Sequence, residues 1–214
     1  MRPPDRPHVT LKLATSLDGR IATATGESQW ITGDAAREQG HRLRAVHDAI
    51  LVGVETVLAD DPELTVRLPS PIAGGRQPLR VVMDSRLRTP PSARIAAANT
   101  LILTAADPRF VGGAQVQQVA AENGRPAISA VLAALSERGV RSLLIEGGGQ
   151  VAASFLEAGA VDAIEWFRAP ILLGGQGRPG VAALALARLS DAPRFRRLAV
   201  QPLGDDLWER YERL

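Results

Sequence analysis

The sequence has no cysteine, a single lysine and only three histidines in 214 residues. The absence of cysteine excludes disulfide bonds and thiol catalysis. His8, His41 and His47 do not have the spacing of a zinc site, and the H-x-E and P-C-x-x-C signature of zinc deaminases is missing. We therefore expect no metal site.

Long apolar runs are also lacking. Even Val181–Ala187 is far shorter than the roughly 20 residues of a membrane span, and the N-terminus does not resemble a secretion signal. The hydrophobic share of 45% is ordinary for a soluble globular protein. These features predict a cytoplasmic protein with one domain over residues 1–214.

An excess of positive charge is lacking as well, although the calculated pI is 9.9. The formal net charge is only +2, and few groups titrate between neutral pH and the range of arginine. Arginines alternate with acids along the chain, as at Arg37-Glu38 and Glu137-Arg138. This mixed surface argues against nucleic-acid binding.

Strand and helix patterns alternate along the chain. The patterns predict strands over residues 9–14, 49–53, 79–84, 100–104, 115–119, 140–146 and 161–168. They predict helices over residues 34–46, 54–59, 128–138 and 150–158, with loops over Ser16–Gly33 and Pro69–Pro78. Two strands, 195–201 and 207–214, are expected at the end. This order predicts an α/β protein with a mostly parallel sheet and an antiparallel C-terminal pair.

The segment Leu143–Gln150 (LLIEGGGQ) combines a buried strand, three glycines and a helix start. Glycines let the backbone approach a ligand closely, and a helix N-terminus favours anions. This suits a dinucleotide pyrophosphate. A tight strand-to-helix turn without a ligand is the alternative, because the spacing is not the G-x-G-x-x-G fingerprint.

Lys12 is the only lysine among 25 basic residues. A lysine on a strand is often an edge residue that reaches solvent, but a solitary one suits a point-charge contact to a phosphate. Arg44 and Arg67 are further phosphate candidates, with ordinary surface charges as the alternative. These cations predict a site for an anionic small molecule.

Two other features of the first third of the chain have open interpretations. Trp30, which looks buried from the sequence, is either a stacking platform for a planar ring or a core anchor. Asp60 and Asp61 precede Pro62, which is typical of a local turn, and either carboxylate could also orient a ribose hydroxyl or an amide.

Five segments follow in order over nearly the whole chain: LKLATSLDGRIATATGESQWIT, ILVGVETVLADDPELTVR, VVMDSR, IEGGGQVAASFLEAGAVDAI and APILLGG. Together they closely resemble the reductase domain of bacterial riboflavin biosynthesis enzymes. The resemblance implies a three-layer α/β/α dihydrofolate-reductase-like fold. It also implies a homodimer and 5-amino-6-(5-phosphoribosylamino)uracil reductase activity.

The resemblance also implies roles for matching positions. The implied substrate set is Lys12, Ser28, Arg44, Leu64, Arg67 and Glu146. The implied NADPH set is Ala14, Trp30, Thr56, Asp60, Ser85, Gly148, Gly149, Gln150, Val151, Ala152, Ala153 and Ser154. Ser85 and Arg86 would lie near the 2′-phosphate of the cofactor, with a solvated loop as the alternative for Arg86 and Arg88.

The implied reaction is hydride transfer to C1′ of the ring-opened ribose. Asp60 is a candidate for orienting the reacting centre or supplying the proton that accompanies the hydride, and water is the alternative proton source. Lys12 is a second catalytic candidate. The resemblance includes no deaminase half, so we expect either a separate deaminase or an undeaminated diaminopyrimidinone substrate. A pterin-like substrate and a non-catalytic nucleotide-binding module are further alternatives.

Overall fold

The computed structural model describes residues 6–68 and 76–214, so most of the predicted loop Pro69–Pro78 lies outside the described residues. The chain forms two compact units. Unit 1 is Met1–His8 with His41–Leu144, and unit 2 is Val9–Gly40 with Ile145–Leu214. Within the described residues, no helix is long and apolar enough to cross a membrane.

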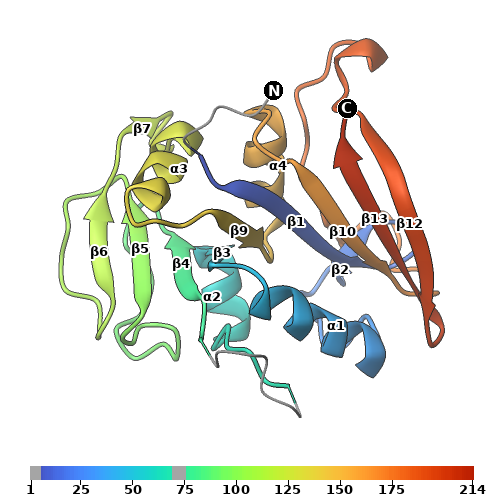
Figure 1. The fold of residues 1–214 in the computed structure, drawn as a ribbon, viewed down its shortest axis with the longest axis horizontal. Helices are drawn as coiled ribbons and strands as arrows, with labels where there is room; N and C mark the ends of the chain where they lie inside the picture. The colour runs from blue at the N-terminus through green and yellow to red at the C-terminus, as the bar shows by residue number, and fades with distance from the viewer. Residues whose placement is uncertain (1–5, 69–75) are drawn as a thin grey trace. The chain divides into compact units, whose positions relative to one another are not determined.

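Unit 1 is built on parallel strands (Figure 1). The strands β3 (Ala49–Gly53), β4 (Leu79–Met83), β5 (Thr100–Thr104) and β6 (Gln115–Gln118) pair in this order, each parallel to the next, and β9 (Ser142–Ile145) adjoins β3. Every residue of β3 and β5 is buried. Continuous apolar runs are typical of parallel strands covered on both faces, and the predicted strands are confirmed.

Two helices belong wholly to unit 1. The helix α2 (Val54–Asp60) follows β3 directly, and α3 (Ile128–Ser136) follows the small hairpin of β7 (Ala121–Glu122) and β8 (Arg125–Pro126). α3 buries Val131 and Leu135 on one side, as its apolar spacing predicts.

Asp61 ends α2 in a way that the sequence does not predict. Its backbone is left-handed with φ of 40°, and its amide donates to the carbonyl of Val57. Its side-chain Oδ1 accepts the backbone N–H of Arg94 at 2.8 Å. Asp61 therefore joins two distant segments, where the sequence predicted a local turn.

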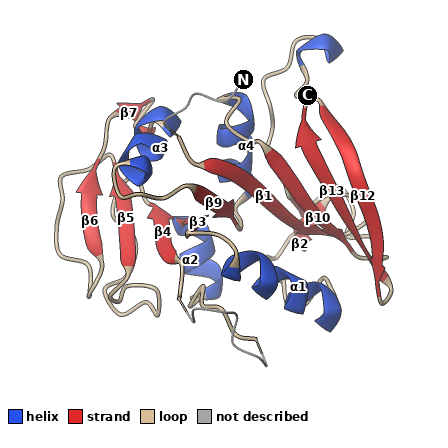
Figure 2. Ribbon diagram, viewed as in Figure 1, coloured by secondary structure: helices blue, strands red, loops and turns tan. Residues whose placement is uncertain are grey.

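Unit 2 combines parallel and antiparallel strands, drawn red in Figure 2. The strands β1 (His8–Thr15) and β10 (Ala163–Arg168) are parallel. The strand β13 (Asp206–Arg213) is antiparallel to both β10 and β12 (Phe195–Leu203). The predicted antiparallel C-terminal pair is confirmed.

Helix α4 (Gly149–Glu157) lies in unit 2 and buries Phe155 completely. Helix α1 (Asp34–Ala45) begins in unit 2 and continues into unit 1. A short 3₁₀ helix, η1 (Leu189–Asp191), precedes β12. The sequence predicted α1 and α4 to within one or two residues.

The sequence did not predict one small antiparallel pair in unit 2. β2 (Arg20–Ala22) pairs with β11 (Arg178–Pro179). β2 interrupts the segment Ser16–Gly33, which we expected to be loop throughout. The pairing ties this loop to a segment more than 150 residues further along the chain.

Candidate functional site

Lys12 is an interior cation of unit 2. On β1 the neighbouring Leu11 and Leu13 are buried, and alternation places Lys12 on the opposite face. Its Nζ lies 4.0 Å from Oε2 of Glu146 and 5.7 Å from the ring centroid of Phe167. Only 21% of the Lys12 side chain is exposed. The position therefore does not fit the interpretation of Lys12 as an edge residue that reaches solvent.

Helix α1 passes close to the same lysine. A Cβ added to the buried Gly40 would lie 3.9 Å from Cε of Lys12. The glycine therefore leaves room for the lysine stem beside the helix. Within unit 2, Lys12 thus has a helix, an aromatic ring and a carboxylate around it, which is a specific environment for a positive charge.

Glu165 is a residue that sequence reasoning missed. It is the register partner of Lys12 on β10 and of Arg210 on β13. Its carboxylate accepts Nε1–H of Trp208 at 2.6 Å and Nε–H of Arg210 at 3.3 Å. Burial raises the pKa of Glu165, although both hydrogen bonds oppose the shift. A glutamate at an alternating apolar position of the strand AIEWFR is the sequence signal for such a buried acid.

The glycine turn before α4 suits an anion. Gly147 and Gly148 have φ of 132° and 83°, which favour glycine. Gly148 is the N-cap, without a side-chain capping bond, and α4 has no acidic residue in its first turn. The helix start thus presents backbone N–H groups with positive dipole character and without an acidic side chain.

Gly149 has a different role from its two neighbours. A Cβ there would lie 2.4 Å from the carbonyl oxygen of Pro179, and the Gly149 oxygen accepts the N–H of Ala182 at 2.9 Å. This glycine lets segment 179–182 pack against the helix start. Gly149 thus stabilises the turn through contacts within the protein.

The remaining α4 residues of the predicted cofactor set differ in accessibility. Val151, Ala152 and Ala153 are buried, so only their backbone could contact a ligand. Ser154 donates its hydroxyl to the carbonyl of Gln150 at 3.0 Å, within the helix. Gln150 is exposed in the first turn. The helix start is therefore the part of this segment that suits a ligand.

Asp18 organises the turn that follows β1. It accepts Oγ–H of Ser16 at 2.6 Å and the backbone N–H groups of Leu173 and Gly174 at 3.1 and 2.7 Å. These hydrogen bonds, led by that from Ser16, lower the pKa of Asp18 to about 2. In the same turn, the backbone carbonyl of Gly19 accepts a hydrogen bond from the N–H of Gly180.

Trp30 is exposed, which corrects the expectation of a buried tryptophan. Its relative exposure is 67%, and the Arg37 guanidinium lies 4.7 Å from its ring centroid. The core-anchor interpretation is therefore wrong, whereas an exposed ring beside a cation remains available for stacking. In the same unit, Ser28 is half-buried in the loop before it, and Ala14 is half-buried on β1.

Unit 1 contains the other predicted substrate residues, which meet at the segment Asp61–Leu68. Arg44 of α1 donates from Nη1 to the carbonyl of Thr65 at 3.0 Å. Leu64 is 4% exposed and has φ of 50°. Arg67 donates from Nη1 to Oγ1 of Thr65 at 3.1 Å and lies 3.4 Å from Oε2 of Glu63. The structure thus brings Arg44, Leu64 and Arg67 to one segment.

Glu63 is surrounded by arginines. Its second carboxylate oxygen forms an ion pair with Arg94, and its backbone carbonyl accepts Nη1–H of Arg80 at 3.5 Å. Because Arg94 and Arg67 share the Glu63 carboxylate, its single negative charge does not neutralise both arginines. With Arg44 and Arg80, four arginines stand against the two acids Asp61 and Glu63 at this segment, which suits an anionic ligand.

The predicted cofactor residues of unit 1 follow two neighbouring parallel strands. Thr56 and Asp60 lie on α2, directly after β3, and share one helix face. Ser85 is the second residue after β4, behind Asp84. Ligands of open α/β sheets bind at the carboxyl ends of the strands, and the segments that follow β3 and β4 carry these three residues.

The turn that contains Ser85 is anchored by the buried Asp84. Oδ2 of Asp84 accepts both the N–H and the hydroxyl of Thr89, at 2.7 and 2.8 Å. Ser85 is half-buried, and Arg86 is exposed. Arg88 forms an ion pair with Glu55, so this arginine is not simply solvated.

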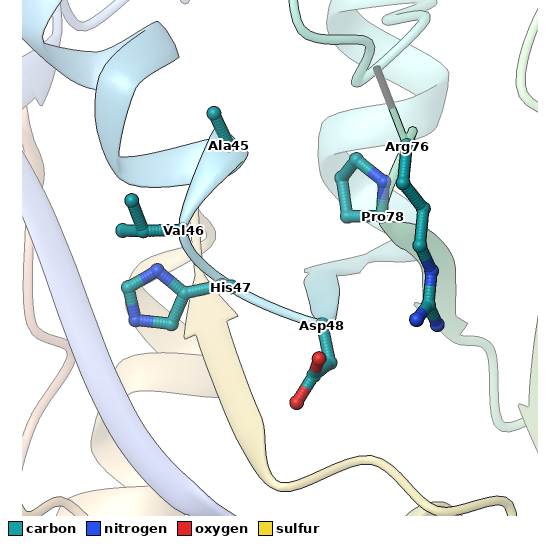
Figure 3. Close-up of a pocket in the computed structure, with 6 residues that line it drawn as sticks. All are labelled: Ala45, Val46, His47, Asp48, Arg76 and Pro78. Atoms are coloured by element: carbon teal, nitrogen blue, oxygen red, sulfur yellow. The ribbon is translucent and has the colours of Figure 1, made fainter. Parts of the chain in front are cut away.

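A small cavity of about 110 Å³ in unit 1 is not the predicted site. Its lining is Ala45, Val46, His47, Asp48, Arg76 and Pro78 (Figure 3). Burial raises the pKa of Asp48, but hydrogen bonds from Arg141 and Ser142 outweigh this effect and lower the pKa overall. Asp48 thus ties the β3 and β9 segments together, which is a structural role.

Within residues 6–68 and 76–214, no group of three or more His, Cys, Asp or Glu side chains could hold a metal ion. The substrate and cofactor sets are each divided between the two units.

Parallel strands with candidate ligand residues after their carboxyl ends, together with an antiparallel C-terminal pair, define an α/β protein of the dihydrofolate-reductase-like class. Dihydrofolate reductase from Enterococcus faecalis, complexed with NADP(H) and RAB-propyl, shares this fold with a TM-score of 0.57 at 14% identity, over 96% of each chain. The family model described as the RibD C-terminal domain matches residues 7–208. The chain therefore belongs to this family.

Relatives of known sequence and structure agree with the family. Riboflavin biosynthesis protein RibD of Bacillus amyloliquefaciens is 40% identical over 94% of this chain and 56% of the relative. The 2,5-diamino-6-ribosylamino-4(3H)-pyrimidinone 5′-phosphate reductase of Methanothermobacter thermautotrophicus is 39% identical over 96% of this chain and 98% of that protein. Acinetobacter baumannii RibD superposes with a TM-score of 0.87 at 32% identity, over 99% of this chain and 59% of that one.

The chain thus spans a little over half the length of the bacterial RibD relatives. The expected family and fold class are confirmed. The roles of individual site residues stay predictions.

Proposed function

We propose that this protein is an NADPH-dependent reductase of a pyrimidine ribotide in riboflavin biosynthesis. The observation that carries the proposal is the interior position of Lys12 beside Glu146, which places a point charge in a covered setting. Family membership supports the reaction class, because the archaeal relative that matches over nearly its whole length is named as a ribotide reductase.

In unit 2 the proposed substrate residues are Lys12, Ser28 and Glu146, and in unit 1 they are Arg44, Leu64 and Arg67. A phosphate suits guanidinium groups with fixed forks and an ammonium point charge. The hydrogen bond from Arg44 to Thr65 supports this role, because it holds one binding arginine beside the segment of the other.

The cofactor in this proposal is NADPH, and the α4 start fits its pyrophosphate. Gly148, Gly149 and Gln150 form this helix start, which has no side-chain N-cap bond and no acidic residue in its first turn. Trp30 is exposed for stacking, and Ala14, Thr56 and Ser85 contribute further contacts. Ser85, with the exposed Arg86, is assigned to the 2′-phosphate, which would favour NADPH over NADH.

The bound cofactor supplies a hydride to C1′ of the ring-opened ribose. The protein positions the two partners. The imine nitrogen must also gain a proton, and Asp60 is assigned to orient that centre or deliver the proton. Asp60 is exposed at the end of α2.

A second substrate is favoured by one comparison. The relative from Methanothermobacter is named for the undeaminated diaminopyrimidinone ribotide. The same reduction before deamination is therefore the second candidate function. In the first candidate, deamination of the pyrimidine precedes this reduction.

We also propose a homodimer with one reductase domain per chain. The strand β12 lies at the edge of the unit 2 strands and exposes Leu198 and Val200 by 54% and 45%. An exposed strand edge with apolar side chains is a common pairing surface. A cytoplasmic location stays a prediction from the sequence.

A substrate panel that follows NADPH absorbance tests the proposed function. The panel contains the ribotide before and after deamination, the same compounds without phosphate, and a pterin. We expect turnover only with the phosphorylated pyrimidines and a preference for NADPH over NADH. Tight NADPH binding without turnover on any pyrimidine would contradict the proposal in favour of a non-catalytic module.

A further inference from the structure

Three side chains hold the backbone of Thr65, Val66 and Arg67 from outside this segment. Arg44 donates to the Thr65 carbonyl at 3.0 Å. Gln77 accepts the N–H of Val66 at 2.8 Å and donates to its carbonyl at 3.2 Å. His41 accepts the N–H of Arg67 at Nδ1, at 3.2 Å. Four consecutive backbone groups of an irregular segment thus bond to protein side chains.

This arrangement fixes the register of the segment. His41 and Arg44 are three residues apart on α1 and therefore lie on one helix face. Gln77 stands two residues before β4, which is anchored between β3 and β5. Because regular elements carry or adjoin all three side chains, the segment cannot shift by one residue without losing several hydrogen bonds.

We propose that His41 and Gln77 are positioning residues that hold Arg67 for the phosphate of the substrate. The inference rests on the proposed function, which assigns Arg67 to that phosphate. Sites on loops are less precise than sites on helices or strands unless their surroundings lock them. His41 and Gln77 supply that lock without contacting the ligand.

The Arg67 side chain is held as well, yet keeps donors for a ligand. Its contacts to Thr65 and Glu63 both use Nη1. A guanidinium has five N–H donors, so these two contacts leave others for a phosphate. The backbone bonds from His41 and Gln77 therefore decide where the remaining donors point.

The role of His41 requires a particular nitrogen. Nδ1 accepts a hydrogen bond, so it carries no proton in this state. The Oδ1 of asparagine stands as many bonds from Cα as Nδ1 of histidine, whereas the oxygen of glutamine lies one bond further out. His41→Asn can therefore keep the acceptor, and His41→Gln displaces it.

The test compares His41→Asn, His41→Gln and Gln77→Leu with His47→Asn as the control. His47 lies near the end of α1, and its Nδ1 contacts the carbonyl of Leu43. The measurements are the hydrogen exchange rate of the Arg67 amide, the KM for the ribotide, the KM for NADPH, kcat and the thermal midpoint. We expect His41→Gln and Gln77→Leu to raise the ribotide KM about tenfold, as for the loss of one net hydrogen bond.

The KM for NADPH should stay within about twofold in these variants, as expected for a site without a changed contact. The Arg67 amide should exchange faster in His41→Gln, while His41→Asn and His47→Asn should match the wild type. Unchanged exchange and ribotide KM in His41→Gln would overturn the inference. An equal rise of both KM values together with a lower thermal midpoint would overturn it too, because His41 would then act only on stability.

Failure of the proposed function gives a different result. A folded wild type that turns over no ribotide would overturn that function and, with it, the role of Arg67. An active wild type with an unaffected His41→Gln variant would overturn only the positioning role. The two failures are therefore distinguishable from one set of assays.

Discussion

Nζ of Lys12 lies 4.0 Å from Oε2 of Glu146, and the side chains are only 21% and 6% exposed. This separation is longer than a hydrogen bond. A covered ion pair contributes little net stability, because desolvation of both charges opposes their attraction. The proposed function assigns both residues to substrate binding.

Lys12→Ala should raise the ribotide KM about 10- to 100-fold, the cost of one charge-assisted hydrogen bond. Steady-state kinetics with the phosphorylated pyrimidine measure this change. Arg196→Ala is the matched control, since Arg196 forms an exposed ion pair with Glu212 at 2.8 Å in the same unit. An unchanged KM in Lys12→Ala would indicate a substrate without a phosphate, such as a pterin.

Trp208→Phe should destabilise the protein by about 2 kcal/mol, the cost of removing a hydrogen bond to a charged group. The phenyl ring keeps the stacking position against Phe167, but Glu165 loses its 2.6 Å donor. Urea unfolding at pH 7 measures the difference in free energy. Trp166→Phe is the control, because Trp166 donates at 2.8 Å to the neutral hydroxyl of Thr15 and should cost only about 1 kcal/mol.

The stability cost of Trp208→Phe should depend on pH. The raised pKa of Glu165 means that its contribution to stability is present below pH 4.5 and is lost as pH rises through the folded-state value. The donor from Trp208 limits this loss, so the variant should differ most from the wild type where Glu165 is ionised. Equal destabilisation by the two tryptophan variants at every pH would contradict this account.

Asp18→Asn should lower the free energy of unfolding at neutral pH, and this difference from the wild type should disappear in acid. The pKa of Asp18 is lowered from 3.8 to about 2, so its contribution is present above pH 3.8 and disappears as pH falls towards 2. Urea unfolding between pH 7 and pH 2 should show the wild type and variant curves converging. Asp107→Asn, at an exposed position of unit 1, should not show this convergence.

Gly149→Ala should destabilise the α4 start by roughly 1–3 kcal/mol, the usual cost of overpacking. The new Cβ would lie 2.4 Å from the backbone oxygen of Pro179, so segment 179–182 must move. The KM for NADPH should rise with it. Gly175→Ala is the control, since a Cβ there meets nothing within 4 Å; equal effects in both variants would refute the packing role.

Continuous patterns in the sequence were sufficient to predict most of the helices and strands. The runs AILVG and TLILT are buried along their whole length, and such runs identify parallel strands without tertiary information. The pair β2 and β11 escaped prediction because strands of two or three residues carry no measurable alternation. Their pairing depends on contacts between distant segments.

The candidate site was predictable in composition but not in environment. The solitary Lys12 and the glycine turn stand out in the sequence, whereas the burial of Glu165 depends on its strand neighbours. Trp30 looked buried because tryptophan is apolar, yet its loop leaves it 67% exposed. The side-chain bonds to Val66 and Arg67 likewise come from residues that have no local sequence signature.

The most direct test of the central claim is the transfer of deuterium from NADPH that carries deuterium at both positions of C4 of the nicotinamide ring. The purified protein is incubated with the ribotide and the labelled cofactor, and the product is analysed by mass spectrometry and NMR. We predict a ribitylamino product with a single deuterium at C1′. An unlabelled product, or no product from either the deaminated or the undeaminated ribotide, would contradict the account.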